Sequence, residues 1–164
     1  MKRVFLACGL MCLSTPVLAQ DAFVTSKSLR PELALTAAQA ALQSCQDSGY
    51  QVGVTVVDRS GLPQVFLRDR YAGLHVYETS RRKAWTAVSF RTSTSDLAQS
   101  TQSGQTASGI RHLTDALPLG GGVVIYAGDG SIVGGIGISG APGPDLDEIC
   151  AQDGLDAIAD EIAF

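Results

Sequence analysis

The sequence predicts an α+β fold, a single layered domain whose central antiparallel sheet of two hairpins is flanked by helices. Three observations predict it. Runs rich in β-branched residues occur in pairs, and a turn sequence containing Gly and Asp joins each pair. Segments with the apolar period of a helix separate and enclose these pairs. Removal of a predicted signal peptide, residues 1–19, leaves 145 of 164 residues, a length that suits one domain.

Residues 1–19 have the three parts of a signal peptide: a basic start, the apolar run 4–13, and small residues before a cut after Ala19. The apolar run is shorter than the roughly 20 residues that span a bilayer. Two alternatives are an apolar first helix of the fold, which Pro16 disfavours, and a lipoprotein anchored at Cys12, whose preceding residues fit lipid attachment poorly. We therefore expect a periplasmic or secreted protein.

After cleavage, residues 20–32 are expected to form a flexible leader and residues 33–164 the folded domain. Loss of Lys2 and Arg3 lowers the basic count from 12 to 10, against 16 acidic residues, so the mature net charge is −6. Such a charge argues against nucleic acid or an anionic membrane surface as a partner.

The first predicted helix begins at Thr36. Thr36 and Gln39 form a capping box, in which side chains satisfy free amides of the first turn. Leu42 and Cys45 belong to its apolar stripe, and Gly49 ends the helix. Residues 52–68 then form the first hairpin, with a turn over residues 58–61.

A second helix is predicted over residues 75–90, and Ser93 begins a short capped helix that ends near Gln102. Residues 103–122 are polar and rich in glycine, which indicates a functional loop or a disordered one. The second hairpin covers residues 123–139 around a Gly-Asp-Gly turn. A last helix follows, from Asp145 to Ile162, with carboxylates at its start where the helix dipole favours them.

Cys45 and Cys150 are the two cysteines that remain after cleavage. Two cysteines in an exported chain are a natural disulfide pair. If the first and last helices share one face of the sheet, the two side chains meet. Both also fall on apolar helix faces, so two buried free thiols remain the alternative.

Conventional catalytic signatures are absent from the sequence, including nucleophile elbows, zinc-protease motifs and phosphate loops. Glycines at 134, 135 and 137 lie inside a predicted strand, where they let a helix, a ligand or a second chain approach the backbone closely. The triplet Gly120, Gly121 and Gly122 is either a flexible bend or a backbone surface whose free amides hold a ligand.

Basic residues and histidines are the other candidates. Arg81, Arg82 and Lys83 form a solvated helix face unless one of them turns toward the core or a ligand carboxylate. His75 and His112 are ordinary surface residues in the simpler interpretation. No metal site other than a haem iron is expected, because two histidines without further ligands at a suitable spacing do not make a convincing zinc site.

Several motifs together resemble the GlcG/HbpS-type haem-binding family, which is related to the C-terminal domain of PduO-type proteins. They are Leu119-Gly-Gly-Gly-Val-Val-Ile, the glycine-rich strand and loop over residues 130–143, and Arg82-Lys-Ala-Trp-Thr-Ala. Val54-Thr-Val-Val-Asp followed by Gly61 matches the family's first hairpin. The resemblance covers residues 33–163 and implies an antiparallel sheet flanked by helices, assembly into homo-oligomers, and haem as the cofactor of exported members.

Haem iron takes His, Cys, Met or Tyr as axial ligands. Both methionines leave with the signal peptide, and no haem-attachment motif is present. If haem is bound, the axial candidates are His75, His112, Tyr71 and Tyr77. The propionate or ligand-carboxylate candidates are Arg81, Arg82, Lys83 and Arg111. Candidates for packing against the ring are Leu74, Trp85 and Leu113.

The leading hypothesis is an exported protein, not an enzyme, that takes up, buffers or senses haem, with a membrane sensor or transporter as its partner. One alternative is an accessory protein or enzyme acting on a small organic acid or on haem breakdown. Another is a ligand-free oligomeric interaction module.

Overall fold

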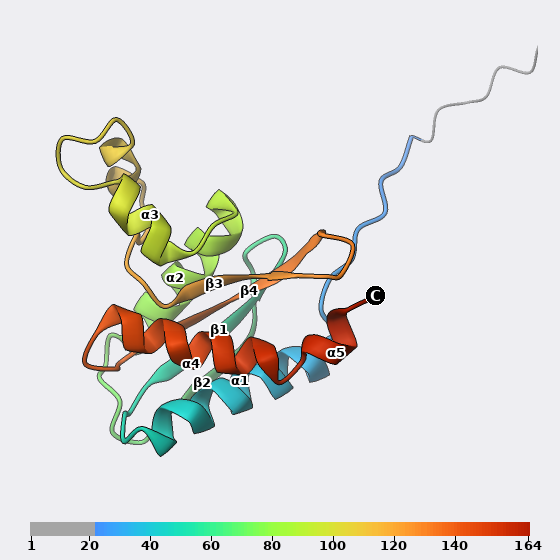
Figure 1. Cartoon of the computed structure of the whole chain (residues 1–164), viewed down its shortest axis with the longest axis horizontal. Coiled ribbons are helices and arrows are strands. Elements are labelled where there is room, and N and C mark those ends of the chain that lie inside the picture. Colours follow the sequence, from blue (N-terminus) through green and yellow to red (C-terminus); the bar gives the residue numbers. More distant parts are fainter. Residues whose placement is uncertain (1–21) are drawn as a thin grey trace, which may run out of the picture.

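The computed structural model describes residues 22–164, so the predicted signal peptide lies outside the described residues. Within them, helices cover both faces of one four-stranded sheet (Figure 1). The elements in chain order are α1 (Pro31–Asp47), β1 (Gly53–Asp58), β2 (Pro63–Arg68), α2 (Val76–Phe90), α3 (Thr94–Ser100), a 3-10 helix η1 (Ser108–His112), β3 (Gly122–Tyr126), β4 (Ile132–Ser139), α4 (Pro144–Asp156) and α5 (Ala159–Ile162).

The predicted α+β class is confirmed. The strand order is β2-β1-β4-β3, and every neighbouring pair is antiparallel. Each predicted hairpin is present, and β1 pairs with β4 to join the two hairpins into one sheet. No helix in residues 22–164 has the length and apolar character needed to cross a membrane.

One sheet face packs on α1 and α4, which lie side by side in Figure 1. Alternate residues point to this face because side chains alternate along a strand. The buried residues there include Val54 and Val56 from β1, and Ile136 and Ile138 from β4. The structure joins the two helices by a disulfide between Cys45 and Cys150, whose Cα atoms are 5.5 Å apart.

The other face packs on α2, and the glycines of β4 allow that helix to approach closely. A Cβ atom added at Gly137 would lie 2.1 Å from the Ser80 carbonyl oxygen, and one at Gly135 would lie 2.6 Å from Val88. Any side chain at these positions would push α2 off the sheet. Of the three partners expected, the structure shows a helix at Gly135 and Gly137, whereas Gly134 lies against Val57 of β1 and Leu29.

The start of the first helix was predicted wrongly. Helix α1 begins at Pro31, with Arg30 as N-cap, because proline suits the first helical position, where no amide partner is needed. Thr36 lies inside the helix, where its hydroxyl donates to the Glu32 carbonyl oxygen at 3.1 Å. The last helix also differs, since it divides into α4 and α5 after Asp156.

Substitution by alanine should distinguish the true N-cap, Ser93, from Thr36, which lies inside a helix. Ser93 is a true N-cap whose hydroxyl accepts from the Asp96 amide at 3.1 Å, so Ser93→Ala should cost about 1 kcal/mol of unfolding free energy. Thr36→Ala should change it by less than about 0.5 kcal/mol, since an interior helical position favours alanine. Urea unfolding of both variants measures the difference. A larger loss at Thr36 would contradict the structure.

Candidate functional site

His75 lies at the amino-terminal end of α2, where it is the N-cap residue. Its imidazole is exposed and forms no hydrogen bond within residues 22–164. The ring lies against Gly73, since a Cβ atom at that position would lie 2.6 Å from the His75 Cε1 atom. Gly73 therefore provides the space that lets this imidazole rest on the loop backbone with its nitrogens unengaged.

Apolar side chains surround the same end of α2. Leu74 is 93% exposed and Tyr71 is 79% exposed. Tyr77 is half-exposed and packs edge-on against Phe66 of β2, with ring centroids 4.7 Å apart. A monomer in water rarely presents so much apolar surface beside one imidazole unless a ligand or a partner covers it.

The arginines nominated from the sequence are already engaged within the chain. Arg81 forms ion pairs with Glu78 at 3.1 Å and with Asp115 at 2.9 Å, and these contacts raise the pKa of its guanidinium. Arg82 donates to the Ala116 carbonyl oxygen at 2.9 Å. Arg111 donates to two carbonyl oxygens at the end of α3. These contacts hold the 108–117 segment against α2 and α3.

Lys83 is buried, with 1% of its side chain exposed. Its ammonium donates to Asp147 Oδ2 at 2.7 Å and to the Ile138 carbonyl oxygen at 2.9 Å. Removal from water lowers the pKa of Lys83 and raises that of Asp147, because each charged form loses its hydration. Lys83 thus ties α2 to β4 and α4, and its ammonium does not reach the surface.

The glycine triplet is buried as well. The Gly122 amide donates to Thr94 Oγ1 at 2.8 Å, and the Gly121 amide donates to Glu148 Oε2 at 3.2 Å. A Cβ atom at Gly120 would lie 3.0 Å from the Pro144 carbonyl oxygen and closer still to Ser95. The triplet lets the start of β3 pack closely between α3 and α4. The Gly121 and Gly122 amides are already hydrogen-bonded within the chain and are not free to bind a ligand.

The remaining candidates lie in different places. His112 is exposed at the end of η1, and Leu113 follows it, half-exposed. Trp85 lies ten residues after His75 on α2, roughly 15 Å away along the helix axis. Its indole packs on Gly61 in the β1–β2 turn. Tyr71, Leu74 and Tyr77 therefore lie at the same end of α2 as His75, and Trp85 lies away from them.

One residue near His75 and one cavity at the far end of α2 were not predicted from the sequence. Arg70 is exposed beside Tyr71, and within the described part of the chain it has no acidic partner. A cavity at the far end of α2 is lined by Arg59, Arg91 and Tyr126. The sequence feature that could have indicated this cavity is Arg91, an arginine directly after a helix, where glycine is usual. Among residues 22–164, no three His, Cys, Asp or Glu side chains gather as a metal site.

A family model described as "Haem degrading protein HbpS-like" matches residues 29–156. The crystal structure of a double mutant of HbpS from Streptomyces reticuli is 38% identical, with a TM-score of 0.79 over 88% of this chain and 97% of that one. The crystal structure of a PduOC–haem complex is 33% identical, with a TM-score of 0.75 over 80% of this chain and 95% of that one.

The corrinoid adenosyltransferase PduO of Salmonella typhimurium is 36% identical over 104 residues, which are 62% of this chain. The same region is 31% of PduO, so this chain matches about a third of that relative's length.

Proposed function

This chain belongs to the HbpS-like family, which is related to the C-terminal domain of PduO, and from this premise we propose that it binds haem outside the cytoplasm. Similarity to a structure that contains haem supports the ligand. The predicted signal peptide supports the compartment. The observation that carries the proposal is the exposed, unbonded imidazole of His75, which lies at the same end of α2 as exposed apolar side chains.

The residues at the amino-terminal end of α2 fit haem in three respects. The His75 imidazole is a normal axial ligand for the iron, and Gly73 leaves room for its ring. Leu74 and Tyr71 offer apolar surface to the macrocycle. Arg70 and the positive end of the helix dipole suit the anionic propionates. When bound, haem would supply an iron that accepts a nitrogen ligand and a porphyrin ring whose visible absorption reports that ligand.

An exposed site of this kind suits transfer or sensing of haem better than long-term storage. Residues this exposed would leave bound haem open to a second copy of the chain, or to a membrane sensor or transporter. The exposed apolar residues at positions 71, 74 and 77 would form part of that contact. Assembly into a homo-oligomer belongs to the same proposal.

Titration of the mature protein with hemin tests this function. The wild type should show a saturable shift of the Soret band at one haem per chain. His75→Ala should abolish the spectrum of the imidazole complex and weaken binding by at least about tenfold, which corresponds to roughly 1.4 kcal/mol. His112→Ala is the matched control and should leave the spectrum unchanged. The absence of a saturable shift in the wild type would refute the proposal, and loss only in His112→Ala would refute the site.

Haem breakdown is a second candidate, since the description of the matching family model names that activity. Incubation of the haem-loaded protein with a reductant and oxygen separates the two. Loss of the Soret band with release of iron, faster than for free hemin, would establish breakdown. A stable Soret band over the same period would establish binding without turnover.

A further inference from the structure

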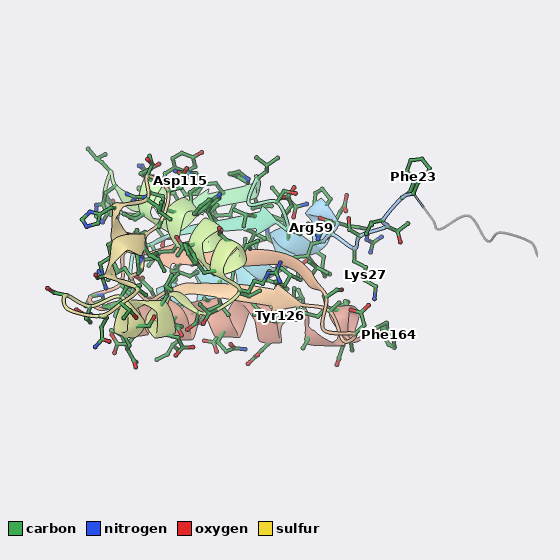
Figure 2. All side chains as sticks on the ribbon, turned by 90° about the horizontal axis from the view of Figure 1, so that it is seen from above. Phe23, Lys27, Arg59, Asp115, Tyr126 and Phe164 are labelled. Carbon is green, nitrogen blue, oxygen red and sulfur yellow. A yellow bond between two sulfur atoms is a disulfide. The ribbon has the colours of Figure 1, made fainter. Side chains whose placement is uncertain are left out.

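A cavity of about 940 Å³ lies at the carboxyl-terminal end of α2. The β1–β2 turn, the last turns of α2, the β3–β4 turn and residues 24–27 of the leader form its walls. In Figure 2, Arg59, Lys27 and Tyr126 lie on the half of the molecule from which the leader departs, and Asp115 lies on the other half. The volume is within the range of sites that hold small organic ligands, about 300–1,000 Å³.

The charges that line this cavity do not cancel. Lys27 is neutralised by Asp129, since its Nζ atom lies 2.7 Å from the Asp129 Oδ2 atom. Arg59 and Arg91 are exposed, and within residues 22–164 neither guanidinium has an acidic partner. Two unpaired guanidinium groups therefore face one cavity in a chain whose formal net charge is −4.

Two aromatic rings accompany these arginines. Trp85 is half-buried, and its ring is held in place by the turn, since a Cβ atom at Gly61 would lie 2.6 Å from the Trp85 Cδ1 atom. The Tyr126 hydroxyl donates to the Arg91 carbonyl oxygen at 3.3 Å, and the residue is 44% exposed. The cavity thus combines flat apolar surface with cationic groups.

Arg91 occupies an unusual backbone conformation. It is the C-cap of α2 with a φ angle of 57°, and it is the one residue other than glycine in the described chain with a positive φ. Glycine adopts this left-handed conformation without a steric penalty. The backbone at this position would therefore favour glycine, and it does not account for the arginine.

We propose that this cavity binds a small aromatic acid, with a single planar ring and two negative charges. Guanidinium groups pair with carboxylates through two parallel hydrogen bonds, and aromatic rings such as the indole and phenol that line the cavity stack on aromatic ligands. The site is separate from the proposed haem site. His75 and Arg91 cap opposite ends of α2 and are sixteen residues apart, roughly 24 Å along the helix axis.

Trp85 is the only tryptophan of the chain, so its indole N–H gives a single resonance that reports directly on the cavity. The mature, nitrogen-labelled protein is titrated with terephthalate, without hemin. The Trp85 resonance should shift and saturate. Benzoate, with one carboxylate, should bind about tenfold more weakly, and the neutral terephthalamide should give no saturable shift.

Variants assign the two guanidinium groups. Arg59→Gln and Arg91→Gln should each weaken terephthalate binding by about tenfold. Arg91→Gly should weaken it equally while leaving the melting temperature unchanged or higher, because glycine relieves the left-handed backbone. Arg68→Gln, which removes an exposed arginine of β2 outside the cavity, is the matched control and should bind as the wild type does.

Equal binding by wild type and the Arg59→Gln/Arg91→Gln double variant would overturn the proposal, as would an unmoved Trp85 resonance in the wild type. Equal affinity for terephthalate and terephthalamide would show that charge does not select the ligand, which also overturns it. A failure of hemin binding leaves this measurement intact, so the two proposals can fail separately.

Discussion

Replacement of Lys83 by Met should lower the free energy of unfolding by about 3–5 kcal/mol, the usual cost of removing one partner of a buried ion pair. The volume is nearly kept, so packing changes little. The loss arises because Asp147, 5% exposed, retains a carboxylate with no counter-charge. The Ile138 carbonyl oxygen also loses its bond to the ammonium. Urea unfolding at neutral pH measures the change.

The pH dependence of Lys83→Met identifies the cause. Burial already raises the pKa of Asp147, and loss of the ammonium should raise it further. A carboxyl group whose folded pKa is raised favours the folded state at low pH, and this contribution is lost as the pH rises through the folded pKa. The difference in unfolding free energy between Lys83→Met and wild type should therefore shrink as the pH falls from neutral toward 3.8, the ordinary pKa of an Asp side chain.

A second replacement supplies the matched control. Asp147→Asn in the Lys83→Met background removes the stranded charge and keeps an oxygen for the Ala141 amide, which donates to Asp147 Oδ1 at 3.0 Å. The double variant should be more stable than Lys83→Met alone. The single variant Asp147→Asn completes the comparison. If the loss of unfolding free energy in the double variant equals the sum of the losses in Lys83→Met and Asp147→Asn, the charges do not interact, and the ion pair has no part in the loss.

The fold was predictable because its determinants are local. Alternating β-branched residues, Gly and Asp turns, and helical stripes identified both hairpins and the principal helices. The errors fell where one local signal competed with another. Thr36 and Gln39 match a capping box, but Pro31 starts the helix five residues earlier. The pairing of β1 with β4 joins strands from different hairpins, and no local pattern shows such a contact.

The candidate site was predictable by residue type and less so by position. His75 and its apolar neighbours are adjacent in sequence, so the histidine, the leucine and the tyrosines could be nominated together. The sequence allowed one residue of the basic run to turn toward the core but did not identify Lys83, because nothing in the run indicates the Asp147 that meets it 64 residues later. Arg59 and Arg91 come from different elements, and only the folded chain brings them to one cavity.

Loss of the disulfide should lower the free energy of unfolding about as much as Lys83→Met does. The Cys45→Ala/Cys150→Ala variant should lose about 2–5 kcal/mol of unfolding free energy, because the bond closes a loop of 105 residues and restricts the unfolded chain. The unfolded variant should also expose more surface, so the slope of unfolding free energy against urea should increase. A loss caused only by the two smaller side chains would leave that slope unchanged.

Chemical reduction of the wild type is the control that separates the bond from the side chains. Reduced wild type and the double alanine variant should be similarly unstable, and the oxidised wild type should exceed both. Folded protein with two titratable thiols and no change on reduction would contradict the disulfide and favour two buried free cysteines. Because such bonds persist in oxidising compartments, the same comparison bears on export. Protein kept in the cytoplasm should match the reduced form, and exported protein should match the oxidised one.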